Sequence, residues 1–117
     1  MKVLVIGAGK LGAQVISQLK KNPHIKMIVA DVRERPAAVE QGIIDKVDLR
    51  IHLTPLNIGD IIADVKPDLI LLARTVDDWG QGDMPMGTEY VAGMEREISR
   101  TSVPVIPVSG RTFGHSC

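Results

Sequence analysis

The sequence predicts a doubly wound α/β fold with three layers, in which a five-stranded parallel sheet lies between helices. Short apolar runs alternate along the chain with segments whose apolar residues recur at helical spacing. Strands that alternate with helices imply right-handed crossovers and a parallel sheet covered on both faces. Hydrophobic residues make up 44% of the chain but aromatic residues only 3%, so aliphatic side chains must build the core. The expected strand order is 3-2-1-4-5.

The first strand–helix–strand unit has the clearest pattern. Val3 to Ile6 is a short β-branched run that ends at a glycine, which is typical of a buried strand. Residues 10–21 repeat apolar side chains at helical spacing, and Asn22-Pro23 ends this predicted helix. Ile25 to Val32 is the predicted second strand.

Two shorter elements are expected next. Pro36 suits the first position of a helix, and residues 37–42 form a short helix closed by a glycine. Leu49 to Leu53 is a weaker strand, because Arg50 and His52 alternate with apolar neighbours. This alternation predicts a strand at the edge of the sheet, with one face in water.

The second half of the chain continues the alternation. Asn57 is expected to cap a helix that runs to about Val65. The most apolar run, LILLA at 69–73, predicts the fourth strand, and a further helix is expected from Gly87 or Thr88 to about Arg100. Residues 103–108 form the fifth strand, and the two prolines within it indicate a sheet edge.

We expect one domain over residues 1–108, followed by a polar tail, Ser109 to Cys117. The loop from Arg74 to Met86 is long for a small domain and is rich in Asp, Gly and Pro. It is either a lid or partner-docking loop, or an exposed loop that Trp79 anchors to the body of the protein.

Composition excludes several classes of function. Fourteen basic and fourteen acidic residues cancel, so the chain lacks the basic excess of a nucleic-acid binder. No apolar run approaches the length of a membrane span, and a single cysteine suits a reducing compartment. We therefore expect a cytoplasmic protein without membrane insertion. No cluster of His, Cys and Asp has the spacing of a metal site.

A glycine motif follows the first strand. The residues Gly7-Ala8-Gly9-Lys10-Leu11-Gly12 fit the pattern G-x-G-x-x-G. The first glycine permits the tight turn, the second leaves room for a pyrophosphate beside the main chain, and the third lets the helix pack closely on the sheet. The N–H groups of the first helical turn then face the phosphates.

An acidic residue follows at the distance that a ribose-binding carboxylate requires. Asp31 lies 19 residues after Gly12, at the end of the second strand. Its carboxylate would accept hydrogen bonds from a free ribose diol and repel a 2′-phosphate, which favours NAD. Arg33 and Arg35 indicate NADP instead, because guanidinium groups can clamp that phosphate, unless they are solvated or cover the adenine. We expect NAD, with NADP possible, and include Val32 and Arg33 among the cofactor-binding residues.

Residues 1 to about 73 resemble the Rossmann NAD(P)-binding domain of dehydrogenases. They are also similar to the RCK or KTN nucleotide-sensing domains, although His52-Leu53-Thr54-Pro55-Leu56 departs from the signature that those domains carry after strand three. Ala73, Arg74 and Thr75 follow the fourth strand, beside the expected path of the pyrophosphate and the nicotinamide ribose, and complete the predicted cofactor site.

Three functions are compatible with this pattern. The first is a small protein that binds or senses NAD(P), as a homo-oligomer or beside another subunit that seals its apolar edges. The alternative is a minimal oxidoreductase for a small carbonyl or hydroxy compound, with a site completed by a partner chain. The third is a structural domain that has lost its ligand. No catalytic residue is assigned, because His115 in the tail has no identifiable carboxylate to orient it.

Overall fold

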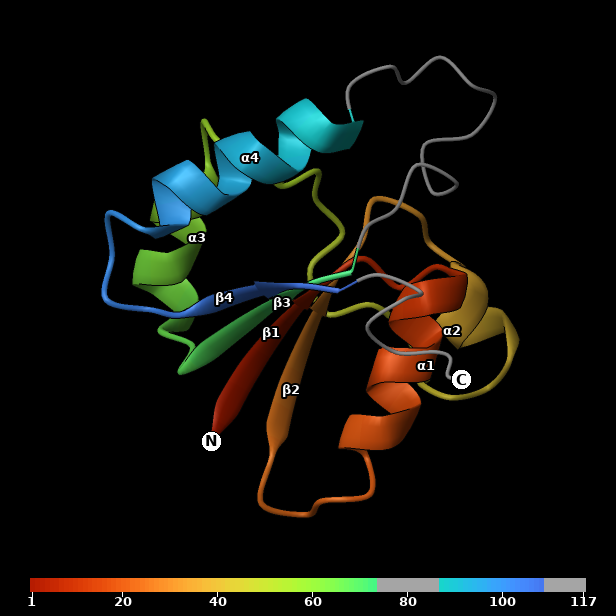
Figure 1. Ribbon diagram of the computed structural model, residues 1–117. Coiled ribbons are helices and arrows are strands. Elements are labelled where there is room, and N and C mark those ends of the chain that lie inside the picture. The colour runs from red at the N-terminus through yellow and green to blue at the C-terminus, as the bar shows by residue number, and fades with distance from the viewer. Residues whose placement is uncertain (74–86, 109–117) are drawn as a thin grey trace, which may run out of the picture.

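The computed structural model describes residues 1–73 and 87–108, which form an α/β domain around one parallel sheet (Figure 1). The elements in chain order are β1 (Lys2–Ile6), α1 (Lys10–Leu19), β2 (Lys26–Ala30), α2 (Ala37–Glu40), α3 (Ile58–Val65), β3 (Leu69–Leu72), α4 (Gly87–Ile98) and β4 (Val105–Pro107). The four strands are ordered β2-β1-β3-β4. The chain therefore starts inside the sheet and builds outward in both directions.

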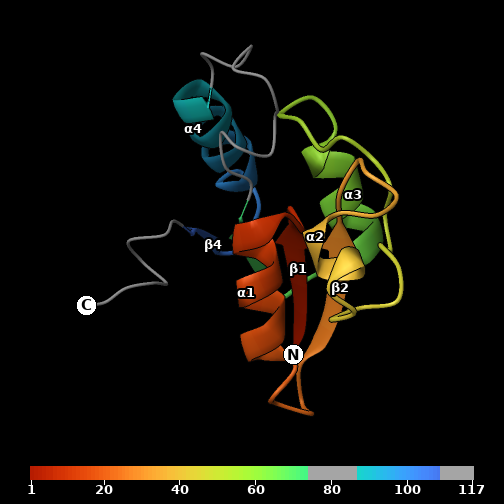
Figure 2. The ribbon, with the colours of Figure 1, turned by 90° about the vertical axis from the view of Figure 1, so that its right-hand side faces the viewer.

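Helices cover both faces of the sheet. Figure 1 shows α1 and α2 on one side and α3 and α4 on the other, and Figure 2 looks onto the layer of α1 and α2 with the sheet behind it. Alternate residues of β1 enter two separate hydrophobic clusters. Val3 and Val5 pack with the α1 side, whereas Leu4 and Ile6 pack with α3 and α4. This alternation produces the three predicted layers.

The expectation of five strands is wrong, because the segment 49–53 makes a single parallel bridge, between Leu49 and Ala30. The bridge lies on the outer side of β2, where the third strand was expected. Next to it, the carboxylate of Asp48 accepts the Val29 N–H at 2.8 Å and so replaces a strand partner with a side chain. Beyond the bridge, residues 50–52 are exposed and the chain leaves the sheet. Without the third strand, the predicted order is the observed one.

Asn57 precedes α3 as predicted, but its side chain does not cap the helix. Its Oδ1 accepts the Thr54 N–H at 2.8 Å, and its Nδ2 donates to the carbonyl of His52 at 3.0 Å. The amide therefore organises the preceding turn, which competes with the helix for this side chain.

The structure tests the prediction of an edge strand near the end of the chain but not the predictions for the loop and the tail. Among the described residues, β4 forms an edge of the sheet, as its prolines predict. The loop 74–86 and the tail 109–117 lie outside the described residues, and with them the predicted site residues Arg74 and Thr75. None of the helices in the described ranges has the length and apolarity needed to cross a membrane.

Candidate functional site

The glycine loop lies where β1 ends and α1 begins. Gly7 has a φ of +104°, in the region that side chains disfavour, so this first position requires glycine. Its N–H donates to the carbonyl of Ala30 at 2.8 Å, which fixes the loop to the end of β2. The turn therefore brings the start of α1 to the carboxyl ends of β1 and β2.

Gly12 brings α1 close to this turn. A Cβ atom at this position would lie 2.0 Å from the carbonyl oxygen of Gly7 and 3.9 Å from the Cβ of Ala73. The first distance leaves no room for any side chain, and the neighbour is main chain that cannot rotate away. Glycine at this position therefore sets how closely the helix approaches the sheet.

Gly9 is a glycine for a different reason. It precedes α1 with φ −72° and ψ −157°, an extended conformation that other residues also adopt. Its backbone geometry therefore does not explain the missing side chain.

The first turn of α1 presents main-chain donors. The N–H groups of a first turn have no partner within their own helix. Within residues 1–73 and 87–108, those of Lys10, Leu11 and Gly12 have no acceptor, and no acidic side chain stands in this turn. Lys10 itself is exposed, and its cation adds to the positive end of the helix dipole. This corner of the molecule therefore suits an anion.

Asp31 stands beside the loop as the first residue after β2. Among the described residues, Asp31 is the one charged residue that is buried, with 6% of its surface exposed. Its Oδ2 accepts the N–H of Ala8 at 2.8 Å and Nη2 of Arg33 at 2.8 Å. Its Oδ1 accepts the main-chain N–H and the Nε of Arg33, both at 2.9 Å. The carboxylate thus joins the glycine loop to the segment that follows β2.

These contacts also determine the charge of Asp31. Burial alone would raise the pKa of this carboxyl group, but the hydrogen bonds from the Arg33 side chain and from the N–H groups of Arg33 and Ala8, together with the guanidinium charge, outweigh it. The pKa of Asp31 is therefore held below its ordinary value. The group is an anion at neutral pH.

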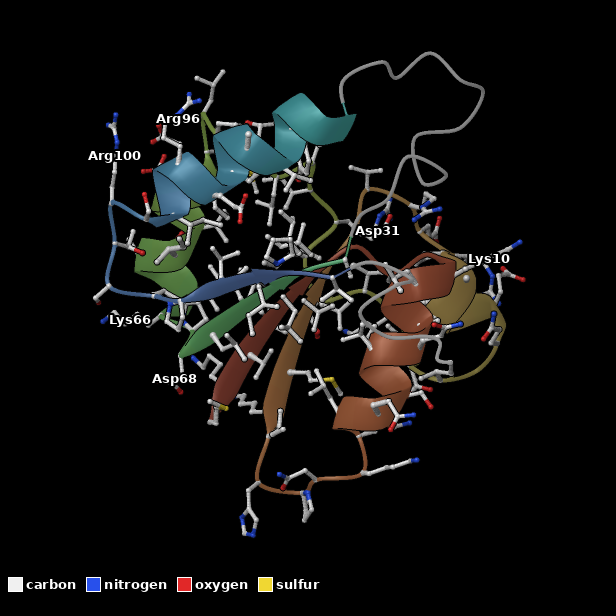
Figure 3. The ribbon with its side chains drawn as sticks, in the orientation of Figure 1. Lys10, Asp31, Lys66, Asp68, Arg96 and Arg100 are labelled. Carbon is white, nitrogen blue, oxygen red and sulfur yellow. The ribbon has the colours of Figure 1, made fainter. Side chains whose placement is uncertain are left out.

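The other predicted residues are distributed around this corner. Ala73 is buried and donates its N–H to the carbonyl of Ile6 at 2.8 Å, so the end of β3 lies next to the loop. Val32 is exposed. Arg35 pairs with Glu40 at 2.6 Å on the surface. Figure 3 shows Lys10 and Asp31 at one end of the strands, with Lys66 and Asp68 at the other.

Sequence reasoning missed the pairing of Asp31 with Arg33, because it assigned each side chain to a ligand separately. The spacing of two residues just after a strand was the available signal. It also missed Asp48, whose role at the edge of β2 depends on how the chain leaves the sheet.

A hollow lies away from the glycine loop, between the end of α1, β2 and the segment 42–48. Its volume is about 420 Å³. Its lining residues are Lys20, Met27, Val29, Gly42, Ile43, Ile44, Asp45, Lys46 and Asp48. None of them belongs to the glycine loop or to the residues around Asp31. Among the described residues, no three His, Cys, Asp or Glu side chains are placed to hold a metal ion.

Comparison with models of protein families finds no match, and comparison with curated proteins finds none either. The geometry of the site is therefore the basis for assigning a function.

Proposed function

We propose that the protein binds a dinucleotide, NAD rather than NADP, through a Rossmann-type site formed by the glycine loop and Asp31. The observation that carries the proposal is the arrangement around residues 7–12. A turn without side chains at Gly7 and Gly9 leads into α1, where Gly12 also lacks one. The first N–H groups of this helix have no acceptor among the described residues, and an ionised carboxylate stands beside the turn.

Each part matches one part of the ligand. The pyrophosphate would accept hydrogen bonds from the first turn of α1, with Lys10 as a further cation. The adjoining ribose would donate its hydroxyl groups to Asp31. An anionic carboxylate disfavours a phosphate on the same ribose, which is why we propose NAD. Val32, Arg33, Ala73, Arg74 and Thr75 would flank the ligand.

The arrangement supports binding of the dinucleotide. We propose that the protein uses this binding to sense the cofactor. An oligomer or a partner subunit remains part of the proposal. We place this contact at β4, which forms an edge of the sheet among the described residues and where Ile106 is 45% exposed. Light scattering at high protein concentration tests the oligomer, and a monomer at all concentrations would remove it.

The binding proposal is tested by calorimetric titration with NADH, NADPH and ADP-ribose. We expect Gly9→Val to abolish binding, because the side chain fills the space that the pyrophosphate needs, while the extended backbone of Gly9 accepts valine without strain. Gly59→Ala is the matched control, since Gly59 lies in α3 with open space around its Cβ position. Absence of binding to the unmodified protein, or full binding by a folded Gly9→Val variant, would refute the proposal.

A further inference from the structure

We infer that Arg33 competes with the ligand for the carboxylate of Asp31, and that this competition sets the selectivity of the site between a free ribose diol and a 2′-phosphate. The inference rests on the proposed function and concerns how the same site selects between two ligands. It comes from the number of hydrogen bonds that Asp31 already accepts.

A carboxylate has about four acceptor positions, two on each oxygen. In Asp31 four N–H donors fill them, since each oxygen accepts one main-chain N–H and one N–H of the Arg33 guanidinium. A ribose diol brings two hydroxyl donors. They cannot be added to this set, so two existing donors must leave.

The two main-chain donors are fixed by the fold. The N–H of Ala8 belongs to the glycine loop, and the N–H of Arg33 belongs to the turn after β2. The guanidinium is the removable pair, because it stands on a long side chain that is 39% exposed, whereas the Asp31 side chain is 4% exposed. The diol must therefore take the positions that Nε and Nη2 of Arg33 now occupy.

A ligand with a 2′-phosphate experiences the opposite effect. Its phosphate carries negative charge to the neighbourhood of an ionised carboxylate, and the Arg33 guanidinium is the cation that offsets this repulsion. Arg33 thus opposes a free diol and assists a phosphorylated one. A residue that only maintained the fold would change the affinity for both ligands in the same direction.

Arg35 provides a matched control. It is the same residue type two positions further along, and it pairs with Glu40 on the surface at 2.6 Å. Within the described residues, Arg35 forms its ion pair with Glu40 and none with Asp31. Replacing it removes a guanidinium from the same loop without changing the donors around the carboxylate.

The experiment is a calorimetric titration of NADH and NADPH into the unmodified protein, Arg33→Met and Arg35→Met. Methionine keeps the apolar stem of the side chain but has no N–H donor. We expect Arg33→Met to bind NADH about three- to tenfold more tightly, and NADPH about tenfold more weakly. Arg35→Met should change both affinities less than about twofold. Arg33→Lys should fall between, because an ammonium keeps the charge but lacks the two-pronged geometry.

The outcomes are distinguishable. Equal weakening of both ligands by Arg33→Met, or unchanged NADH affinity in a folded variant, overturns the inference and leaves the proposed function standing. If Arg33→Met does not fold, Arg33→Lys decides the question by the same opposite shifts. Absence of binding to every protein refutes the proposed function and this inference together.

Discussion

The contact between Gly12 and Gly7 can be tested by a single added methyl group. In Gly12→Ala, the new Cβ would lie 2.0 Å from the carbonyl oxygen and 2.7 Å from the carbonyl carbon of Gly7. Ordinary contacts begin at about 3.4 Å, so α1 or the turn must retreat by more than about 1 Å. Both atoms belong to the main chain. No side-chain rotation can relieve the overlap.

The magnitude follows from two opposing effects. Alanine is favoured over glycine inside a helix by about 1 kcal/mol. Overpacking a close contact costs about 1–3 kcal/mol, and the upper end applies where main chain must move. We expect Gly12→Ala to lower the free energy of unfolding by about 2 kcal/mol, from a total of about 5–15 kcal/mol for a domain.

Urea unfolding followed by circular dichroism measures this loss. With a slope of about 1–3 kcal/mol per molar urea, the midpoint should fall by about 1 M. Gly59→Ala is again the control, because nothing lies within 4 Å of its Cβ position in α3, and it should raise stability by about 0.5–1 kcal/mol. A Gly12→Ala midpoint at or above that of the unmodified protein would show that α1 does not approach the turn this closely.

Two further substitutions test the surroundings of the site and the helix ends. Asp31→Asn should cost about 2 kcal/mol at pH 7, because an amide cannot accept all four N–H donors. The pKa of Asp31 is lowered by folding, so its contribution is complete above the unfolded value of about 3.9 and is lost as the pH falls through the folded value. Urea midpoints of the two proteins should therefore converge below about pH 4, and a constant difference down to pH 2 would contradict this assignment. Lys66 follows α3 in the left-handed conformation, with φ 54° and ψ 56°, which strains the backbone of a residue that has a side chain. Lys66→Gly should therefore raise the free energy of unfolding by about 1 kcal/mol, and the melting temperature with it. A lower melting temperature would contradict this backbone strain.

Local patterns predict the parts of this protein that depend on local geometry. The apolar run at β1, the glycines of the turn and the position of Asp31 after β2 were all visible in the sequence, because each is set by residues a few positions apart. The order of the four strands is the one expected of a doubly wound sheet without its third strand. These features place the loop and the carboxylate at one corner.

The features that the sequence did not reveal depend on competition between partners. Leu49 to Leu53 has a strand-like pattern, but Asp48 satisfies Val29 with a side chain and the chain departs after one bridge. Asn57 could cap α3 or hold the turn before it, and composition does not decide between the two. Arg33 could face a ligand or Asp31, and in the structure it faces Asp31.

The central sheet also divides the interior into two hydrophobic clusters that share no residue, so neighbouring residues of β1 belong to different clusters. Val5 packs on the side of α1, which carries the glycine loop, whereas Ile6 packs on the side of α3 and α4. A substitution within the α3–α4 cluster therefore leaves the packing beneath α1 unchanged, so the two layers can be repacked one at a time.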